Sequence, residues 1–219
     1  WPEAEGGCKY LLSAVDDFTG FPLNFPCVFK NDAACVLEKF VRMVGKPYRV
    51  RSDNALEFKG ENSDWRDECA KQGIIPEYSA PYCPEQNGKV GRWNQTSSNG
   101  IRAVMRNVDP KLWHYAAKFV AYTFARLSRK KGKPSPYELA YGSVPSTKHF
   151  RVFGTLCFAK VHVLRSEIDS TSKLADRFEK GVFLGYCEEN GSHLVGHIRP
   201  DKRTKTGFRW GAHENRTVE

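Results

Sequence analysis

The sequence YRVRSDNALEF (residues 48–58) contains a short strand and the polar turn that follows it. Residues 48–52 fit the strand, which places Asp53 at its end. Strand ends face the functional crevice in open α/β sheets, so the Asp53 carboxylate is a candidate ligand for a divalent metal ion. The alternative is a turn residue whose side chain bonds nearby backbone amides.

Strands and helices alternate around this stretch. Apolar runs, helical spacing and turn residues predict strands at 10–15 and 21–30, a helix at 33–44, a strand at 48–52, a helix at 64–72 and a strand at 74–78. The first two strands are joined by a polar turn and fit a hairpin. Asn31 or Asp32 is expected to cap the first helix, and Gly73 to end the second. This order predicts an α/β core with a partly parallel sheet and helices on its faces.

The second half of the chain changes character at residue 130. Two helices, about 87–107 and 110–129, precede it. Apolar residues recur at helical spacing on the second of them, so we expect Trp113, Tyr122 and Phe153 in the core. Beyond the linker-like KKGKPSP (130–136), short apolar segments predict a small antiparallel β unit. The expected division is a core domain at 1–129, a basic linker at 130–149 and this small β unit at 150–219.

Composition restricts the class of protein. At 219 residues the chain is long enough for one main domain and a smaller unit. No apolar run approaches the roughly 20 residues of a membrane helix. The net charge of +9 favours polyanionic partners, nucleic acid first and acidic protein or lipid surfaces second. Residues 111–133 contain seven basic and no acidic side chains, although such a run also fits a solvated helix end and loop.

The cysteines and the first residues give two further expectations. The 7 cysteines are scattered and show no C-x-x-C spacing, which argues against a zinc site or a disulfide framework. We expect reduced thiols, mostly small core residues. The sequence begins Trp1-Pro2 without a leader, so we expect further residues upstream.

Two segments together resemble the integrase core of copia-type retrotransposons. RSDNALEF (51–58) and PYCPEQNGKVGR (81–92) are similar to the family patterns S-D-N-G-x-E-F and P-Y-x-P-Q-Q-N-G-x-x-E-R, the second of which opens a long helix. The resemblance continues, in the family's order, in GI (73–74), SAPY (79–82), LW (112–113), AA (116–117), PYE (136–138), RVFG (151–154) and KGVFLGY (180–186). It spans nearly the whole chain.

The resemblance implies an α/β protein with an RNase H-like fold, in which helices flank a mixed five-stranded sheet. A small β barrel of the Src-homology-3 type would follow. In that family, three carboxylates bind two Mg²⁺ ions, which activate a water or a DNA 3′-hydroxyl and stabilise the leaving oxygen. The two ions carry four positive charges, so the site needs all three anionic side chains.

Carried over residue by residue, the resemblance indicates a degenerate site. Asp53 matches the second acidic residue, whereas Gly91 stands where the family has the third, a glutamate. The first lies on a strand upstream of this sequence. Asp16 and Asp17 match a structural turn, and Glu85 sits two helical turns too early to replace the glutamate. We therefore expect no catalysis, no metal and no cofactor, with Asp53 vestigial.

The basic residues suit phosphate contacts without a metal. The candidates are Lys89, Arg92, Lys111, Lys118, Arg126, Arg129, Lys130, Lys131, Lys133, Arg203 and Arg209. Phe208 and Trp210 lie among basic residues near the C-terminus and suit either stacking on unpaired nucleotides or packing on a protein. Three functions are possible. The chain could be a catalytically inactive integrase that binds DNA or RNA, or a structural subunit of a protein or ribonucleoprotein assembly. The third is an active integrase, which the loss of the metal-binding carboxylates disfavours. The expected location is intracellular, and nuclear if the family role persists; assembly in an organelle is the alternative.

Overall fold

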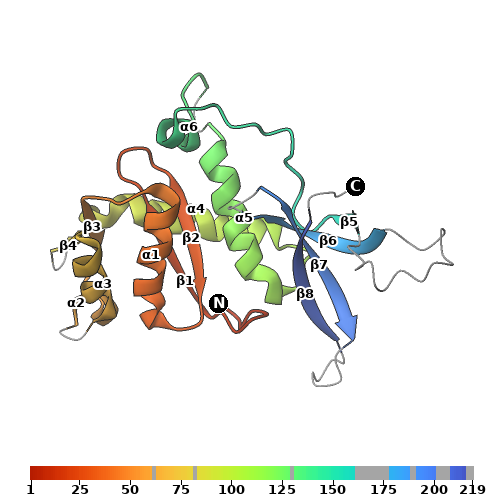
Figure 1. The fold of residues 1–219 in the computed structure, drawn as a ribbon, viewed down its shortest axis with the longest axis horizontal. Coiled ribbons are helices and arrows are strands. Elements are labelled where there is room, and N and C mark those ends of the chain that lie inside the picture. Colours follow the sequence, from red (N-terminus) through yellow and green to blue (C-terminus); the bar gives the residue numbers. More distant parts are fainter. Residues whose placement is uncertain are drawn as a thin grey trace.

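The structure is a computed structural model, and it describes residues 1–60, 63–80, 83–128, 131–160, 178–187, 191–200 and 208–215. Helices and strands alternate in the first part, and strands dominate the end of the chain. In Figure 1 helix α5 runs between the N-terminal elements and the C-terminal sheet. Within the described residues, no helix has the length and apolarity needed to cross a membrane.

The N-terminal half contains two small sheets. Strands β1 (Tyr10–Val15) and β2 (Pro22–Cys27) form the expected antiparallel hairpin. Strands β3 (Arg49–Ser52) and β4 (Ile75–Tyr78) pair in parallel. The connections are η1 (Lys30–Asp32), α1 (Ala33–Val44), α2 (Leu56–Lys59) and α3 (Asp64–Gln72). Gly73 ends α3 in the left-handed conformation (φ 62°), as a residue without a Cβ allows.

One helix start differs from expectation. Asp32 precedes α1, but its side chain makes no bond to the first turn of that helix. Its carboxylate instead accepts hydrogen bonds from the backbone N–H groups of Val28 and Phe29, at 3.0 and 2.9 Å. The predicted cap therefore holds the loop before the helix rather than the helix end.

The second half contains the longest helices. The turn η2 (Pro84–Asn87) leads into α4 (Gly88–Val104), and η3 (Pro110–Leu112) leads into α5 (Trp113–Arg126). The stretch predicted as a linker contains a short helix, α6 (Pro136–Tyr141), capped by the Ser135 hydroxyl. Tyr137 and Ala140 of α6 pack against the cluster built on β2, so these residues are part of the folded body.

The C-terminal sheet has the order β5-β6-β7-β8, with antiparallel neighbours throughout. Its strands are β5 (Leu156–Lys160), β6 (Phe178–Tyr186), β7 (His193–Pro200) and β8 (Phe208–Asn215). The antiparallel β unit agrees with the sequence pattern. Its closure into a barrel, and the division of the chain into three domains, stay predictions.

The sheets of the first half differ from a single five-stranded sheet. β1 and β3 lie in separate two-stranded sheets. They nevertheless share one helical layer, because Leu12 of β1 and Val50 of β3 pack on the same cluster around Leu37 of α1 and Trp65 of α3. The architecture is mixed α/β, as expected.

The largest core cluster joins both halves of the chain. Trp113, Tyr122 and Phe153 are 1%, 8% and 5% exposed, so their predicted burial is confirmed. The same cluster contains Phe183 and Val195 of the C-terminal sheet. Helix α5 contacts both β2 and β6.

A buried polar network fixes α4 against β2. The Asn24 amide donates to the Ser97 hydroxyl at 2.7 Å and to the Ala117 carbonyl at 2.8 Å. Its oxygen accepts from the Trp93 indole at 3.1 Å and from the Ser13 hydroxyl at 2.9 Å. Buried polar groups are costly without partners, so this amide holds both long helices to the sheet.

Candidate functional site

Asp53 lies directly after β3 and is exposed. Its Oδ1 accepts a hydrogen bond from the Ala55 backbone N–H at 3.2 Å, which is the contact of a turn aspartate. The Asn54 side chain donates to the Ser79 carbonyl at 2.6 Å and joins the ends of β3 and β4. The sequence predicted Asp53 at a strand end, either as a metal ligand or as a turn residue. The observed hydrogen bond is the one expected of a turn residue.

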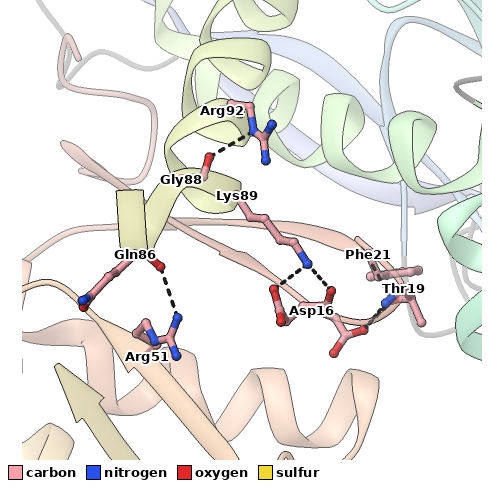
Figure 2. Close-up of polar contacts among 9 residues, drawn as sticks. Asp16, Thr19, Phe21, Arg51, Gln86, Gly88, Lys89 and Arg92 are labelled. Carbon is pink, nitrogen blue, oxygen red and sulfur yellow. Dashed lines mark hydrogen bonds and ion pairs between the residues drawn. The ribbon is translucent and has the colours of Figure 1, made fainter. Parts of the chain in front are cut away.

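Lys89 at the start of α4 reaches the turn between β1 and β2. Its ammonium lies 2.6 Å from Oδ1 of Asp17 and donates to the Asp17 carbonyl at 2.6 Å (Figure 2). The bond from Lys89 and its charge lower the pKa of the Asp17 carboxyl below its usual range. Asp16 shapes the turn, since its Oδ2 accepts from the Thr19 backbone and hydroxyl. The carboxylates of both aspartates are therefore engaged, Asp16 within the turn and Asp17 with Lys89.

Gln86 links η2, the turn that precedes α4, to β3. Its side-chain oxygen accepts from the Ala80 N–H at 2.8 Å, and its carbonyl accepts from the Arg51 guanidinium at 3.3 Å (Figure 2). Arg51 and Arg49 also pair with Glu77, at 3.2 and 2.6 Å, which lowers the pKa of that carboxyl. Arg51 was not among the predicted nucleic-acid-binding residues. Its position two residues before Asp53 is the feature of the sequence that could have indicated it.

Gly91 occupies an exposed position on α4. A Cβ atom built there would have no neighbouring atom within 4 Å. Arg92, the next residue, donates from Nε to the Gly88 carbonyl at 3.2 Å. Packing therefore does not require glycine at position 91, and the side chains available from this turn are the cations Lys89 and Arg92.

The donor set does not fit a pair of Mg²⁺ ions. Among the residues that the structure describes, no three His, Cys, Asp or Glu side chains gather closely enough to hold a metal ion. Asp53 is bound to a backbone amide, and Glu85 lies exposed in η2. Hard divalent cations need several anionic oxygens, and the side chains near the start of α4 are largely cationic.

The other predicted binding residues lie elsewhere. Lys111 and Lys118 are exposed beside the N-terminal segment, where the Lys111 carbonyl accepts from Glu5. Arg126 is half-buried, with its guanidinium 3.4 Å from the centre of the Tyr122 ring and 4.5 Å from that of Tyr137. Its guanidinium thus contacts two aromatic rings, and its predicted role in phosphate binding stays a prediction.

The rest of the basic candidates are only partly described. Lys131 and Lys133 are exposed ahead of α6. Arg209 lies on β8 opposite Arg199, and its side chain is outside the described part. Arg129, Lys130 and Arg203 lie outside the described residues. Among the described candidates, Lys89 and Arg92 lie in one turn of α4, and Arg51 contacts the Gln86 carbonyl just before it.

Solved structures identify the fold. The chain is similar to the simian T-cell lymphotropic virus intasome solved in complex with PP2A regulatory subunit B56 gamma, with a TM-score of 0.54 and 15% identity over 95% of this chain and 71% of that one. It is also similar to the catalytic core domain of BIV integrase, with a TM-score of 0.50 and 19% identity over 60% and 85% of the two chains. The fold is that of an integrase catalytic core.

Sequence comparison finds polyproteins of retrotransposons and retroviruses. No protein-family model matches the chain. It is 26% identical over 198 residues to the retrovirus-related Pol polyprotein from transposon RE2 of Arabidopsis thaliana, a match that covers 87% of this chain and 13% of that protein. It is 24% identical over 196 residues to the Gag-Pol polyprotein of feline leukemia virus, covering 87% and 11%. The chain is therefore similar to these polyproteins in sequence and to integrase catalytic cores in fold, and it spans about an eighth of the length of the polyproteins.

Proposed function

We propose that this integrase-like chain has lost DNA cutting and joining and retains nucleic-acid binding through the cations at the start of α4. The observation that carries the proposal is Gly91, which is exposed and unhindered in the position that resembles the family's glutamate. Lys89 and Arg92 occupy the same turn, which contains no acidic residue of its own.

The surroundings of Asp53 support the loss of catalysis. A single carboxylate binds Mg²⁺ weakly and leaves most of its six coordination positions to water. Asp53 already accepts a backbone hydrogen bond, and Arg51 and Lys89 add positive charge to this side of the molecule. Cations that repel metal ions attract phosphates, so the same residues favour polyanion binding.

Binding at several salt concentrations tests the retained function. The unmodified chain should bind DNA or RNA with an affinity that falls steeply with salt, because each neutralised phosphate of duplex DNA releases counterions with a slope of about 0.9. Lys89→Gln and Arg92→Gln should each reduce that slope by about 1. Lys71→Gln is the matched control, since Lys71 is exposed on α3 and the substitution removes the same charge. Salt-independent or absent binding would favour a structural subunit held by protein surfaces and contradict the proposal.

Cleavage and joining assays test the loss of catalysis. With Mg²⁺ or Mn²⁺ we expect no product from the unmodified chain. Gly91→Glu is the variant that restores the third carboxylate. Activity of the unmodified protein that disappears on Asp53→Asn would overturn this part of the proposal.

A further inference from the structure

The outer face of strands β5 and β6 carries exposed aromatic side chains. Burial alternates along β5, with Cys157 and Ala159 directed inward. Leu156 and Phe158 point outward and are 54% and 48% exposed, and Phe178 on β6 is 38% exposed. Large rings at this exposure are not part of the core, so their surroundings indicate what contacts them.

The strand register places each of these rings beside a lysine. Phe158 lies opposite Lys180, and Lys160 lies opposite Phe178. Directly opposite residues of an antiparallel pair share one face, and diagonal neighbours lie about 7–8 Å apart. Phe158 and Phe178 are such a diagonal pair. The two rings and the two ammonium groups therefore alternate on a single surface, which we call the β5–β6 face.

The described residues of the β5–β6 face carry charge of one sign. The described residues of this face are Leu156, Phe158, Lys160, Phe178, Lys180 and Val182, and none of them is acidic. The carboxylate of Glu179, between Phe178 and Lys180, lies 3.8 Å from Nδ1 of the buried His197. A partner that matches this face is a polyanion with flat apolar surfaces.

We infer that the β5–β6 face binds unpaired nucleotides of single-stranded nucleic acid, with bases stacked on Phe158 and Phe178 and a phosphate beside Lys180. The inference rests on the proposed nucleic-acid binding and names its substrate. Rings of this kind stack on any exposed base. In a duplex the base faces are already stacked inside, so the rings would find no partner there.

Binding of labelled single-stranded DNA, single-stranded RNA and duplex DNA of equal length tests the inference. Phe158→Leu and Phe178→Leu keep an apolar side chain but remove the flat ring. Each should weaken single-strand binding about fivefold or more and leave duplex binding within twofold. Phe29→Leu is the matched control, because Phe29 is also an exposed phenylalanine and lies before α1. Lys180→Gln should reduce the single-strand salt slope by about 0.7.

The outcomes separate this inference from the proposed function. Salt-dependent binding that is unchanged by both Phe→Leu variants, or reduced equally for duplex and single strand, would contradict single-strand binding at the β5–β6 face. It would leave the proposed nucleic-acid binding in place. No binding of any nucleic acid by the unmodified chain overturns both. The comparison of the DNA and RNA strands shows which of them supplies the unpaired bases.

Discussion

His114 is buried at the start of α5, and its imidazole makes the folded state sensitive to acid. Burial lowers the pKa of this histidine to about 4, although its Nδ1 lies 3.2 Å from the Lys111 carbonyl. An unperturbed histidine titrates near 6.5. Between these values the unfolded chain binds the proton and the folded chain does not. The contribution of neutral His114 to the free energy of unfolding is therefore fully present above about pH 6.5 and is lost as the pH falls toward 4.

Replacing this side chain should flatten that dependence. We expect His114→Gln to remove up to roughly 3 kcal/mol of the difference in unfolding free energy between pH 7 and pH 4. Urea unfolding at pH 7, 5.5 and 4 measures it. Burial also lowers the pKa values of His149 and His193, so part of the acid sensitivity should remain. Identical pH dependences in the two proteins would show that His114 is not the cause.

The thiols should react in an order set by their burial. Cys35 is exposed, whereas burial raises the pKa values of Cys27 and Cys69 to about 11. The thiolate is the reactive form, so at pH 8 a disulfide reagent should modify Cys35 first and Cys27 and Cys69 only on unfolding. Peptide mass spectrometry at several times measures this, with Cys35→Ser as the control. Early modification of Cys69 would mean that α3 opens in the native state.

At the scale of an element, α4 contains two glycines with different surroundings. A Cβ at Gly91 meets nothing within 4 Å, whereas one at Gly100 would lie 3.0 Å from a methyl group of Val120. Gly91→Ala should stabilise the protein by about 0.5–1 kcal/mol, since alanine is the better helix former. Gly100→Ala should stabilise less or destabilise, because it crowds α5. Thermal unfolding of both variants tests the pair, and an equal gain from each would contradict the packing.

Elements with a strong local pattern could be predicted from the sequence. The hairpin, α3 with its glycine stop, and the apolar stripe of α5 lie within a few residues of their expected positions. Partners distant in sequence could not be predicted. The Lys89 pairing with Asp17 and the stacking of Arg126 on Tyr137 depend on three-dimensional placement, and a basic residue has the same local pattern whether it binds phosphate or an aromatic ring.

On the scale of the whole molecule, Phe119 joins the integrase-like core to the C-terminal sheet. Its ring centre lies 5.4 Å from that of Phe153, 6.2 Å from Phe183 and 6.1 Å from Tyr186. Phe119→Ala should destabilise the chain by about 3–5 kcal/mol. If the halves unfold together, hydrogen-exchange protection of β2 and β6 should fall by the same amount. Loss confined to β6 would indicate an independent C-terminal domain.

Asp17 competes with any phosphate for Lys89, because the two side chains already form an ion pair. A phosphate that approaches Lys89 must displace a carboxylate already 2.6 Å away, so part of the binding energy is spent on exchanging one anion for another. Asp17→Asn should therefore tighten nucleic-acid binding, most visibly at low salt, where the internal anion is least screened. Evolution of this turn can thus raise or lower affinity without altering any residue that touches the ligand.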